Sequence, residues 1–334
     1  MEILRIIAKT VFFYLLVILG ATFVMYALLW AAPGDLTDVL CPKGCEPEMR
    51  RELIKTWGLD KPMIVQYGRW LGDAARFRFG TSVSLRQGAP VTELLAPAVR
   101  ITAWMVLGAA FLTLLLAFFL CWRPLRFFSR WLLRLGQFPL VVLSFAPLYI
   151  LAYWSVMLTS RGPAWLVQQG WLDPKTLGRW RDLDLIPFGQ QVSDEAGWMA
   201  LIPFFVSMVL LAIGNNNLAE QASSLRGEIE HLKGQDFMRA VRAKGASFWA
   251  HFLHNLLLPI TQFFSTRAIL LLGTVVIIET IMSINGVGWL LWQAAEMRDT
   301  PVVLAIALFA TVLASLLQML NEIALKLIDP RLRR

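Results

Sequence analysis

Charged side chains are scarce in this chain, since only 16% of its 334 residues are Asp, Glu, Lys or Arg. Hydrophobic residues make up 57%, and 14 residues are Trp, a composition outside the range of an ordinary soluble domain. Cysteine is also rare, and three residues are too few for a disulfide framework. The composition therefore excludes a soluble globular domain and a disulfide-rich scaffold, and it indicates a membrane protein.

Motifs of catalysis are missing as well. The chain contains no Gly-x-x-x-x-Gly-Lys-Ser/Thr phosphate loop, no Gly-x-Ser-x-Gly elbow and no His-Glu-x-x-His sequence. His251 and His254 are spaced to share a helix face, but no carboxylate lies within a turn of the pair, so interfacial polar residues are the better interpretation than a metal site. We expect neither enzymatic activity, nor a metal, nor a cofactor of this chain's own.

The three cysteines divide between two settings. Cys41 and Cys45 lie in a long polar segment, where they form either one local bridge or two free thiols, and a zinc site is not expected without a second pair or a nearby His. Cys121 lies in an apolar run and is interpreted as a small buried hydrophobe.

Long apolar runs recur along the chain, each at or above the roughly 20 residues that a helix needs to cross the hydrocarbon core. Five are uncharged and comprise residues 10–34, 101–122, 135–160, 196–219 and 300–321. A sixth, from about residue 259 to 283, contains Arg267 and Glu279. The first run is longer than the apolar core of a signal peptide, so we expect it to be retained. These runs predict an all-α integral membrane protein with six transmembrane helices and both termini on one side.

Three domains follow from these runs. Residues 1–34 form an N-terminal transmembrane helix, and residues 35–100, which are too polar to span, form an extracytoplasmic subdomain. Residues 101–334 form a five-helix core with a cytoplasmic loop at 220–258. Within the subdomain, helical periodicity runs from Glu48 to Trp57 and from Val65 to Phe77.

The basic residues indicate the orientation of the chain in the membrane. The loop between the second and third runs contains four arginines and no acidic residue: Arg123, Arg126, Arg130 and Arg134. The C-terminal tail from Arg331 to Arg334 is also basic. Because short basic loops face the cytoplasm, we expect both termini there. The net charge of +8 is spread over separate loops, which suits a membrane surface and not a nucleic acid.

The segment from residue 234 to residue 245 is the strongest functional signal. Two small residues, Ala240 and Ala243, allow close approach by another helix, and Gly245 is suited to a left-handed helix cap. Three charged side chains, those of Arg239, Arg242 and Lys244, project toward a partner. A plain positive-inside loop would explain the charge but neither the small residues nor the glycine. We therefore predict that Asp236 to Gly245 docks a soluble partner.

A few polar residues within or at the ends of the apolar runs are candidates for a translocation path. Glu279 is costly in a span unless it faces protein or water, so it either lines a path or bonds a neighbouring helix. Asn215, Asn216 and Asn217 close the fourth run, where they either line a polar path or end the helix in the headgroups. Arg267 lies 12 residues from Glu279, about 18 Å along a helix, so the two cannot pair directly.

Three blocks of sequence resemble the permeases of the peptide and nickel class of ABC importers. The first contains Pro33-Gly-Asp35, Gly58-Leu-Asp-Lys-Pro62, Gln66-Tyr67, Trp70-Leu-Gly72 and Phe79-Gly-Thr-Ser82. The second is Gly234-Gln-Asp-Phe-Met-Arg-Ala-Val-Arg-Ala-Lys-Gly245, which is similar to the family's ATPase-coupling loop. The third runs from Glu279 to Gly288 and is followed by Arg298-Asp299 and Asp329-Pro-Arg331. Together these matches extend over most of the chain.

The resemblance implies the fold of a type I ABC importer permease in a bacterial inner membrane. It implies a second related permease and an extracytoplasmic binding protein as partners, and two ATPase subunits that bind ATP and magnesium. It also implies a small peptide or a similar solute as cargo, although residues 123–197 match the family poorly and leave the solute open.

Two other classes of protein compete with this interpretation. An ATP-independent channel or secondary transporter predicts internal repeats, and we find none between residues 1–160 and 161–334. An intramembrane enzyme predicts a carboxylate pair or a nucleophile with a base, and Glu279 has no acidic neighbour in its own run.

Overall fold

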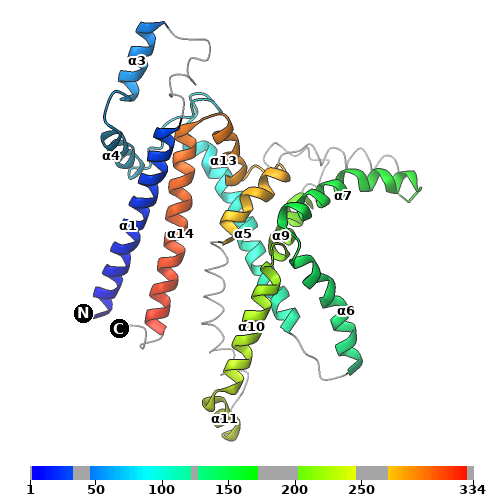
Figure 1. Ribbon diagram of the computed structural model, residues 1–334. Coiled ribbons are helices and arrows are strands. Elements are labelled where there is room, and N and C mark those ends of the chain that lie inside the picture. Colours follow the sequence, from blue (N-terminus) through cyan, green and yellow to red (C-terminus); the bar gives the residue numbers. More distant parts are fainter. Residues whose placement is uncertain (1, 33–45, 122–126, 172–201, 246–269, 329–334) are drawn as a thin grey trace. The chain divides into compact units, whose positions relative to one another are not determined.

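The computed structural model describes residues 2–32, 46–121, 127–171, 202–245 and 270–328. This part of the chain is built almost entirely from helices, with an isolated antiparallel bridge between Thr81 and Pro90 (Figure 1). The helices are α1 (Glu2–Ala31), α3 (Pro47–Trp57), α4 (Met63–Ala74), α5 (Val91–Cys121), α6 (Phe127–Ser144), α7 (Leu148–Gln168), α9 (Ile202–Ile213), α10 (Asn217–Gly234), α11 (Asp236–Ala243), α13 (Val287–Glu296) and α14 (Thr300–Ile328). A further apolar helix comprises Leu270–Ile281.

Three of the described helices are long and apolar enough to cross a membrane. Their spanning segments are Ile7–Ala31, Val91–Cys121 and Thr300–Ile323. A fourth candidate is the pair Leu135–Ser144 and Leu148–Met157, which passes the same test together but bends by 110° at its break. Parts of the fourth and sixth predicted runs, residues 196–201 and 259–269, lie outside the described residues, so the total of six remains a prediction.

The described chain divides into two compact units. The first contains residues 1–100 and 286–326, and the second contains residues 101–285. The core of the first unit joins the start of α5 to α13 and α14 through buried apolar side chains: Val91, Leu95, Ala98, Leu290, Ala294, Val302, Val303, Ala305 and Ile306. The core of the second unit joins the end of α5 to α9 and α10: Ala117, Leu120, Ile213, Leu218, Ala222 and Leu225.

Both helices predicted between residues 48 and 77 are present, as α3 and α4. α3 ends at Gly58, which adopts a φ of 68°, the left-handed conformation that glycine adopts without steric penalty. α4 ends earlier than its periodicity indicates, because Phe77 has a φ of 59° and the Arg78 N–H donates back to the Asp73 carbonyl at 2.9 Å. A bulky residue in this conformation is unusual, so the sequence did not signal the end of the helix.

One buried carboxylate joins the segment before α5 to the start of α14. Asp299 has no exposed surface, and its Oδ2 accepts a hydrogen bond from the Ser82 hydroxyl at 2.5 Å. The same oxygen accepts from the backbone N–H groups of Val83, Ser84 and Leu85, each at 3.1 Å. Because bonds to a charged acceptor are stronger than neutral ones, Asp299 holds residues 82–85 against the first turn of α14.

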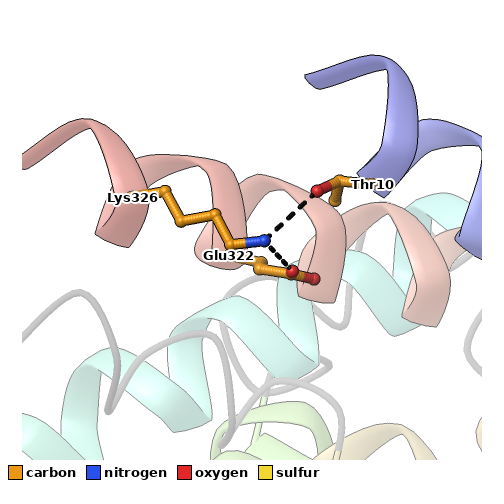
Figure 2. A network of polar contacts seen from close by, with 3 residues as sticks. All are labelled: Thr10, Glu322 and Lys326. Atoms are coloured by element: carbon orange, nitrogen blue, oxygen red, sulfur yellow. Dashed lines mark hydrogen bonds and ion pairs between the residues drawn. The ribbon is translucent and has the colours of Figure 1, made fainter. Parts of the chain in front are cut away.

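The N-terminal part of α1 and the C-terminal end of α14 lie side by side. Figure 2 shows the Lys326 ammonium between two partners, with Nζ 2.5 Å from Glu322 Oε1 and 3.5 Å from the Thr10 hydroxyl. Glu322 lies one turn before Lys326 on α14, whereas Thr10 is buried on α1. The ion pair is therefore within one helix, and the bond to Thr10 links it to the other.

Two breaks between consecutive helices, one between α6 and α7 and the other between α9 and α10, meet within the second unit. Pro147 follows the break between α6 and α7 and has no N–H to continue a helix. The carbonyls of Ser144 and Ala146 at this break accept hydrogen bonds from the N–H groups of Asn216 and Asn215, the latter at 3.1 Å. The N–H groups left free at one break thus pair with the carbonyls left free at the other. Such pairing is needed in a membrane interior, where no water is present to bond to free backbone groups.

Gly214 allows the close approach of these two breaks. A Cβ added there would lie 2.8 Å from Leu148 Cδ1 and 2.9 Å from the Leu210 carbonyl oxygen. We expect Gly214→Ala to lower the free energy of unfolding by about 1–3 kcal/mol through overpacking, measured by thermal unfolding in detergent. Gly136→Ala is the matched control, because a Cβ there meets no atom within 4 Å. Equal losses of stability in the two variants would contradict this packing role.

Candidate coupling and translocation residues

The predicted docking segment forms a short separate helix. α10 ends where Gln235 adopts an extended conformation with a φ of −67° and a ψ of 141°, and α11 begins at the next residue. Figure 1 shows α11 at the C-terminal end of α10. Asp236 stands in the first turn of α11, where a carboxylate interacts favourably with the helix dipole. The sequence thus breaks one helix and restarts another in the space of a single residue.

α11 presents its small residues to the outside. Asp236, Ala240 and Ala243 are all exposed, and their spacing of four and three residues places them on one face of the helix. Lys244 and Gly245 are exposed after the end of the helix. The backbone of Arg239 and Arg242 is helical, whereas their side chains lie outside the described part of the structure.

Gly245 has the conformation expected of a helix cap. Its φ is +64°, and a Cβ at this position would meet no atom within 4 Å. The preceding residue closes the helix, because the Lys244 N–H donates to the Ala240 carbonyl at 3.0 Å. Glycine is therefore needed here for its backbone conformation and not for space.

Glu279 is buried and bonded to a neighbouring helix. It has no exposed surface, and its Oε1 accepts a hydrogen bond from the Thr102 hydroxyl of α5 at 2.6 Å. Glu279 also stands near the end of the helix Leu270–Ile281, where its carbonyl accepts from the Ile284 N–H at 2.9 Å. The hydroxyl provides part of the hydrogen bonding that a buried carboxylate needs.

The three asparagines form the turn between α9 and α10. Asn215 and Asn216 both adopt the left-handed conformation, with φ of 57° and 60°, which asparagine tolerates better than most residues. Asn217 is buried, and its Nδ2 donates to the Leu211 carbonyl at 3.2 Å. The side chains of Asn215 and Asn216 are exposed. Arg267 lies outside the described residues, as do Cys41 and Cys45.

Sequence reasoning did not find Thr102 as the partner of Glu279. The two residues are 177 positions apart, and a threonine in an apolar helix is common enough to carry no signal. It also did not foresee that Asn215 and Asn216 would pair with the break before Pro147, although the tolerance of asparagine for positive φ offered a hint. Cys121, predicted to be buried, is half-buried, and its thiol donates to the Ala222 carbonyl at 3.4 Å.

Helices long and apolar enough to cross a membrane indicate an integral membrane protein. The family described as "Binding-protein-dependent transport system inner membrane component" matches residues 109–334, and the N-terminal family of the same systems matches residues 3–84. The chain belongs to this family of inner membrane components, and it is a multi-pass permease subunit of a binding-protein-dependent importer.

Several named permease proteins resemble the chain over nearly its whole length. The oligopeptide transport system permease protein AppB of Bacillus subtilis (strain 168) is 27% identical over 326 residues, which cover 95% of each chain. The dipeptide transport system permease protein DppB of Alkalihalophilus pseudofirmus is 25% identical over 330 residues, with 95% of this chain and 96% of the relative covered. The di/tripeptide permease protein DppB of Pseudomonas aeruginosa (strain UCBPP-PA14) is 27% identical over 328 residues, 94% of each chain.

Proposed function

We propose that the segment from Asp236 to Gly245 is the element through which an ATPase subunit moves this permease. The observation that carries the proposal is the exposed face of α11, on which small residues stand between a helix break and a left-handed glycine. Alanine side chains allow the close approach of another helix or a groove, and Gly245 ends the helix with a left-handed cap. Arg239, Arg242 and Lys244 supply charge toward the ATPase.

The permease functions within a larger complex. It stands beside a second related permease, two ATPase subunits bind and hydrolyse ATP with magnesium, and a binding protein delivers the solute on the extracytoplasmic side. Closure of the ATPase pair on ATP draws the docking segment with it. The permease helices then alternate between inward-facing and outward-facing states, because each state is favoured by a different ligand.

The permease itself is proposed to have six transmembrane helices, with an extracytoplasmic subdomain at residues 35–100 and both termini in the cytoplasm. The bond between Lys326 and Thr10 supports the placement of both termini on the same side of the membrane (Figure 2), because it brings the N-terminal part of one candidate span to the C-terminal end of another. Two spanning helices with those ends adjacent run in opposite directions.

The substrate proposed for this importer is a small peptide, as the names of its relatives indicate. The test is to purify the chain under an affinity tag from its own cells in mild detergent and to identify the proteins and solutes that accompany it. An ATP-driven peptide importer yields two ATPases, another permease and a binding protein that holds a peptide. A channel or secondary transporter, the competing class, yields the chain without ATPases, and that result would refute the proposal.

Glu279, with Asn215, Asn216, Asn217 and Arg267 as further candidates, is proposed to line the path of the solute. We expect Glu279→Gln to lower uptake by about tenfold or more, which corresponds to ~1.4 kcal/mol, because the variant keeps an oxygen for Thr102 but loses the charge. Thr102→Val removes the hydroxyl and keeps the charge, so it serves as the matched control and should reduce uptake less. Uptake that is normal in Glu279→Gln and lost in Thr102→Val would assign Glu279 a purely structural role.

A further inference from the structure

α4 packs across α1 at a depth that lies inside the apolar span of α1. The candidate span covers Ile7–Ala31, and the Tyr67 hydroxyl of α4 donates to the Leu19 carbonyl at 3.0 Å. Thr22 lies 3.0 Å from the same hydroxyl. Leu19 is 12 residues before the end of the span, about 18 Å at the rise of an α-helix. The phenol of Tyr67 therefore reaches into the apolar part of α1.

The body of α4 lies nearer to the end of that span. Gln66 accepts a hydrogen bond from the Tyr26 hydroxyl at 3.3 Å, and the Trp70 ring lies 6.0 Å from the Tyr26 ring between centroids. Tyr26 is five residues, or about 8 Å, before the end of the span. This depth matches the boundary between headgroups and acyl chains, where amphipathic helices lie about 5–10 Å deep.

The contacts with α1 also show which flank of α4 faces the membrane interior. Tyr67 contacts the deep residues of α1, and the residues three before and four after it, Ile64 and Leu71, share its flank. Gln66 is bonded to the shallower Tyr26 of α1, and the residues three and seven after it, Arg69 and Asp73, share the opposite flank. The deep flank is thus apolar and the shallow flank is charged.

Two further contacts agree with this orientation. The Gln66 amide donates to the carbonyls of Leu59 and Lys61, at 3.3 Å and 2.7 Å, which belong to the polar connection from α3. Arg69 lies beside the end of α3, because a Cβ on Gly58 would be 3.0 Å from Arg69 Nη1. The charged flank therefore faces α3, a helix with five charged residues among its eleven.

We propose that α4 lies in the membrane surface at the C-terminal end of α1, with Ile64 and Leu71 among the lipid acyl chains and Arg69 and Asp73 at the level of the headgroups. Ile64 is 70% exposed in the isolated chain, although it shares the flank of a side chain bonded deep in α1. The lipid face of α1 continues this surface, since Phe23, whose ring centroid lies 5.3 Å from that of Tyr67, is itself 38% exposed. Acyl chains cover both helices without a gap.

A lipid surface suits this flank better than a protein partner does. A binding protein approaches from water and meets α3 and the charged flank of α4 first, whereas Ile64 points along α1 toward the bilayer interior. The proposal makes α4 an anchor that sets the depth of the polar segment beyond α1. It rests on the membrane-spanning assignment of α1 and not on the docking role of α11.

Spin labels at Ile64→Cys and Asp73→Cys test the proposal, because these positions lie on opposite sides of one helix and both side chains are exposed. Each label is placed in a chain whose Cys41, Cys45 and Cys121 are replaced by Ser, assembled with its partner subunits in lipid nanodiscs. Frequent collision of the label with oxygen indicates that it lies among acyl chains, and frequent collision with a water-soluble nickel chelate indicates that it lies in water. We expect the oxygen-to-nickel ratio to exceed unity at residue 64 and to fall below unity at residue 73.

Each other outcome of the collision measurement overturns the proposal. Nickel collision that dominates at both positions would place α4 in water. A label at residue 64 that neither reagent reaches would show that a protein subunit covers the flank. Retained uptake by the same two labelled chains in sealed proteoliposomes confirms that the transporter is assembled, so failure of the lipid assignment is distinguishable from failure of the importer function.

Discussion

Ala240→Trp is expected to abolish solute uptake while the permease remains folded in the membrane. Ala240 is exposed on the face of α11 that it shares with Asp236 and Ala243, so an indole there disturbs no internal packing. The proposed ATPase groove closes on a small side chain, and a bulky one prevents contact along the whole face. A docking contact of this kind is worth about 2 kcal/mol or more, so the ATPase should bind roughly thirtyfold more weakly.

The measurements are uptake of labelled peptide into vesicles and retention of the ATPase subunits on the tagged permease. Ala240→Ser is the matched control, because it changes polarity but hardly changes size, and it should retain both activities. If uptake and ATPase retention are both normal in Ala240→Trp, α11 is not part of the coupling interface. Loss of the permease itself from the membrane would instead indicate a folding defect and would call for the smaller Ala243→Leu change.

Asp299→Ala should release residues 82–85 from the start of α14. The substitution leaves four donors without their acceptor, the Ser82 hydroxyl and the N–H groups of Val83, Ser84 and Leu85. A buried donor left unpaired costs about 1–3 kcal/mol. Because water can enter after local opening, we expect a total loss of about 3 kcal/mol, which raises the equilibrium population of the open segment roughly a hundredfold.

Trypsin provides the measurement for Asp299→Ala, because Arg86 directly follows the segment that would be released, donates its N–H to the Ser82 hydroxyl, and is cleaved when the segment opens locally. Cleavage after Arg51, an exposed residue of α3, is the internal reference and should not change. Asp299→Asn keeps one oxygen acceptor and should give an intermediate rate. Equal cleavage at Arg86 in the native chain and in Asp299→Ala would mean that other contacts hold the segment.

Much of the helical structure was predictable from local pattern. The periodicity from Glu48 to Trp57 corresponds to α3, because its apolar residues repeat at helical spacing and Gly58 supplies the cap. α4 was predictable in its existence but not in its end, since the left-handed conformation of Phe77 opposes the preference of a bulky residue. α11 begins at Asp236, an acidic residue of the kind that often opens a helix, and Gly245 follows the helix with the left-handed conformation that was predicted for it.

The candidate site was less predictable, because its partners come from distant parts of the chain. Glu279 stood out as a carboxylate in an apolar run, but its bond to Thr102 depends on how two helices pack. The asparagine turn was visible as a polar interruption, yet its backbone bonds to Ser144 and Ala146 became apparent only when both helix breaks were seen together. Asp299 belongs to a short sequence motif that gives no sign of the four donors that converge on it.

Composition and spacing were sufficient to establish a helical membrane protein, because apolar run length and helix caps depend on neighbouring residues along the chain, and the resemblance of three sequence blocks to a known family indicated a permease. The placement of buried polar groups required the folded molecule. A carboxylate or a broken helix in an apolar interior is stable only when donors and acceptors from other helices reach it. Which residues supply them depends on packing between helices, and that information is not local to any stretch of sequence.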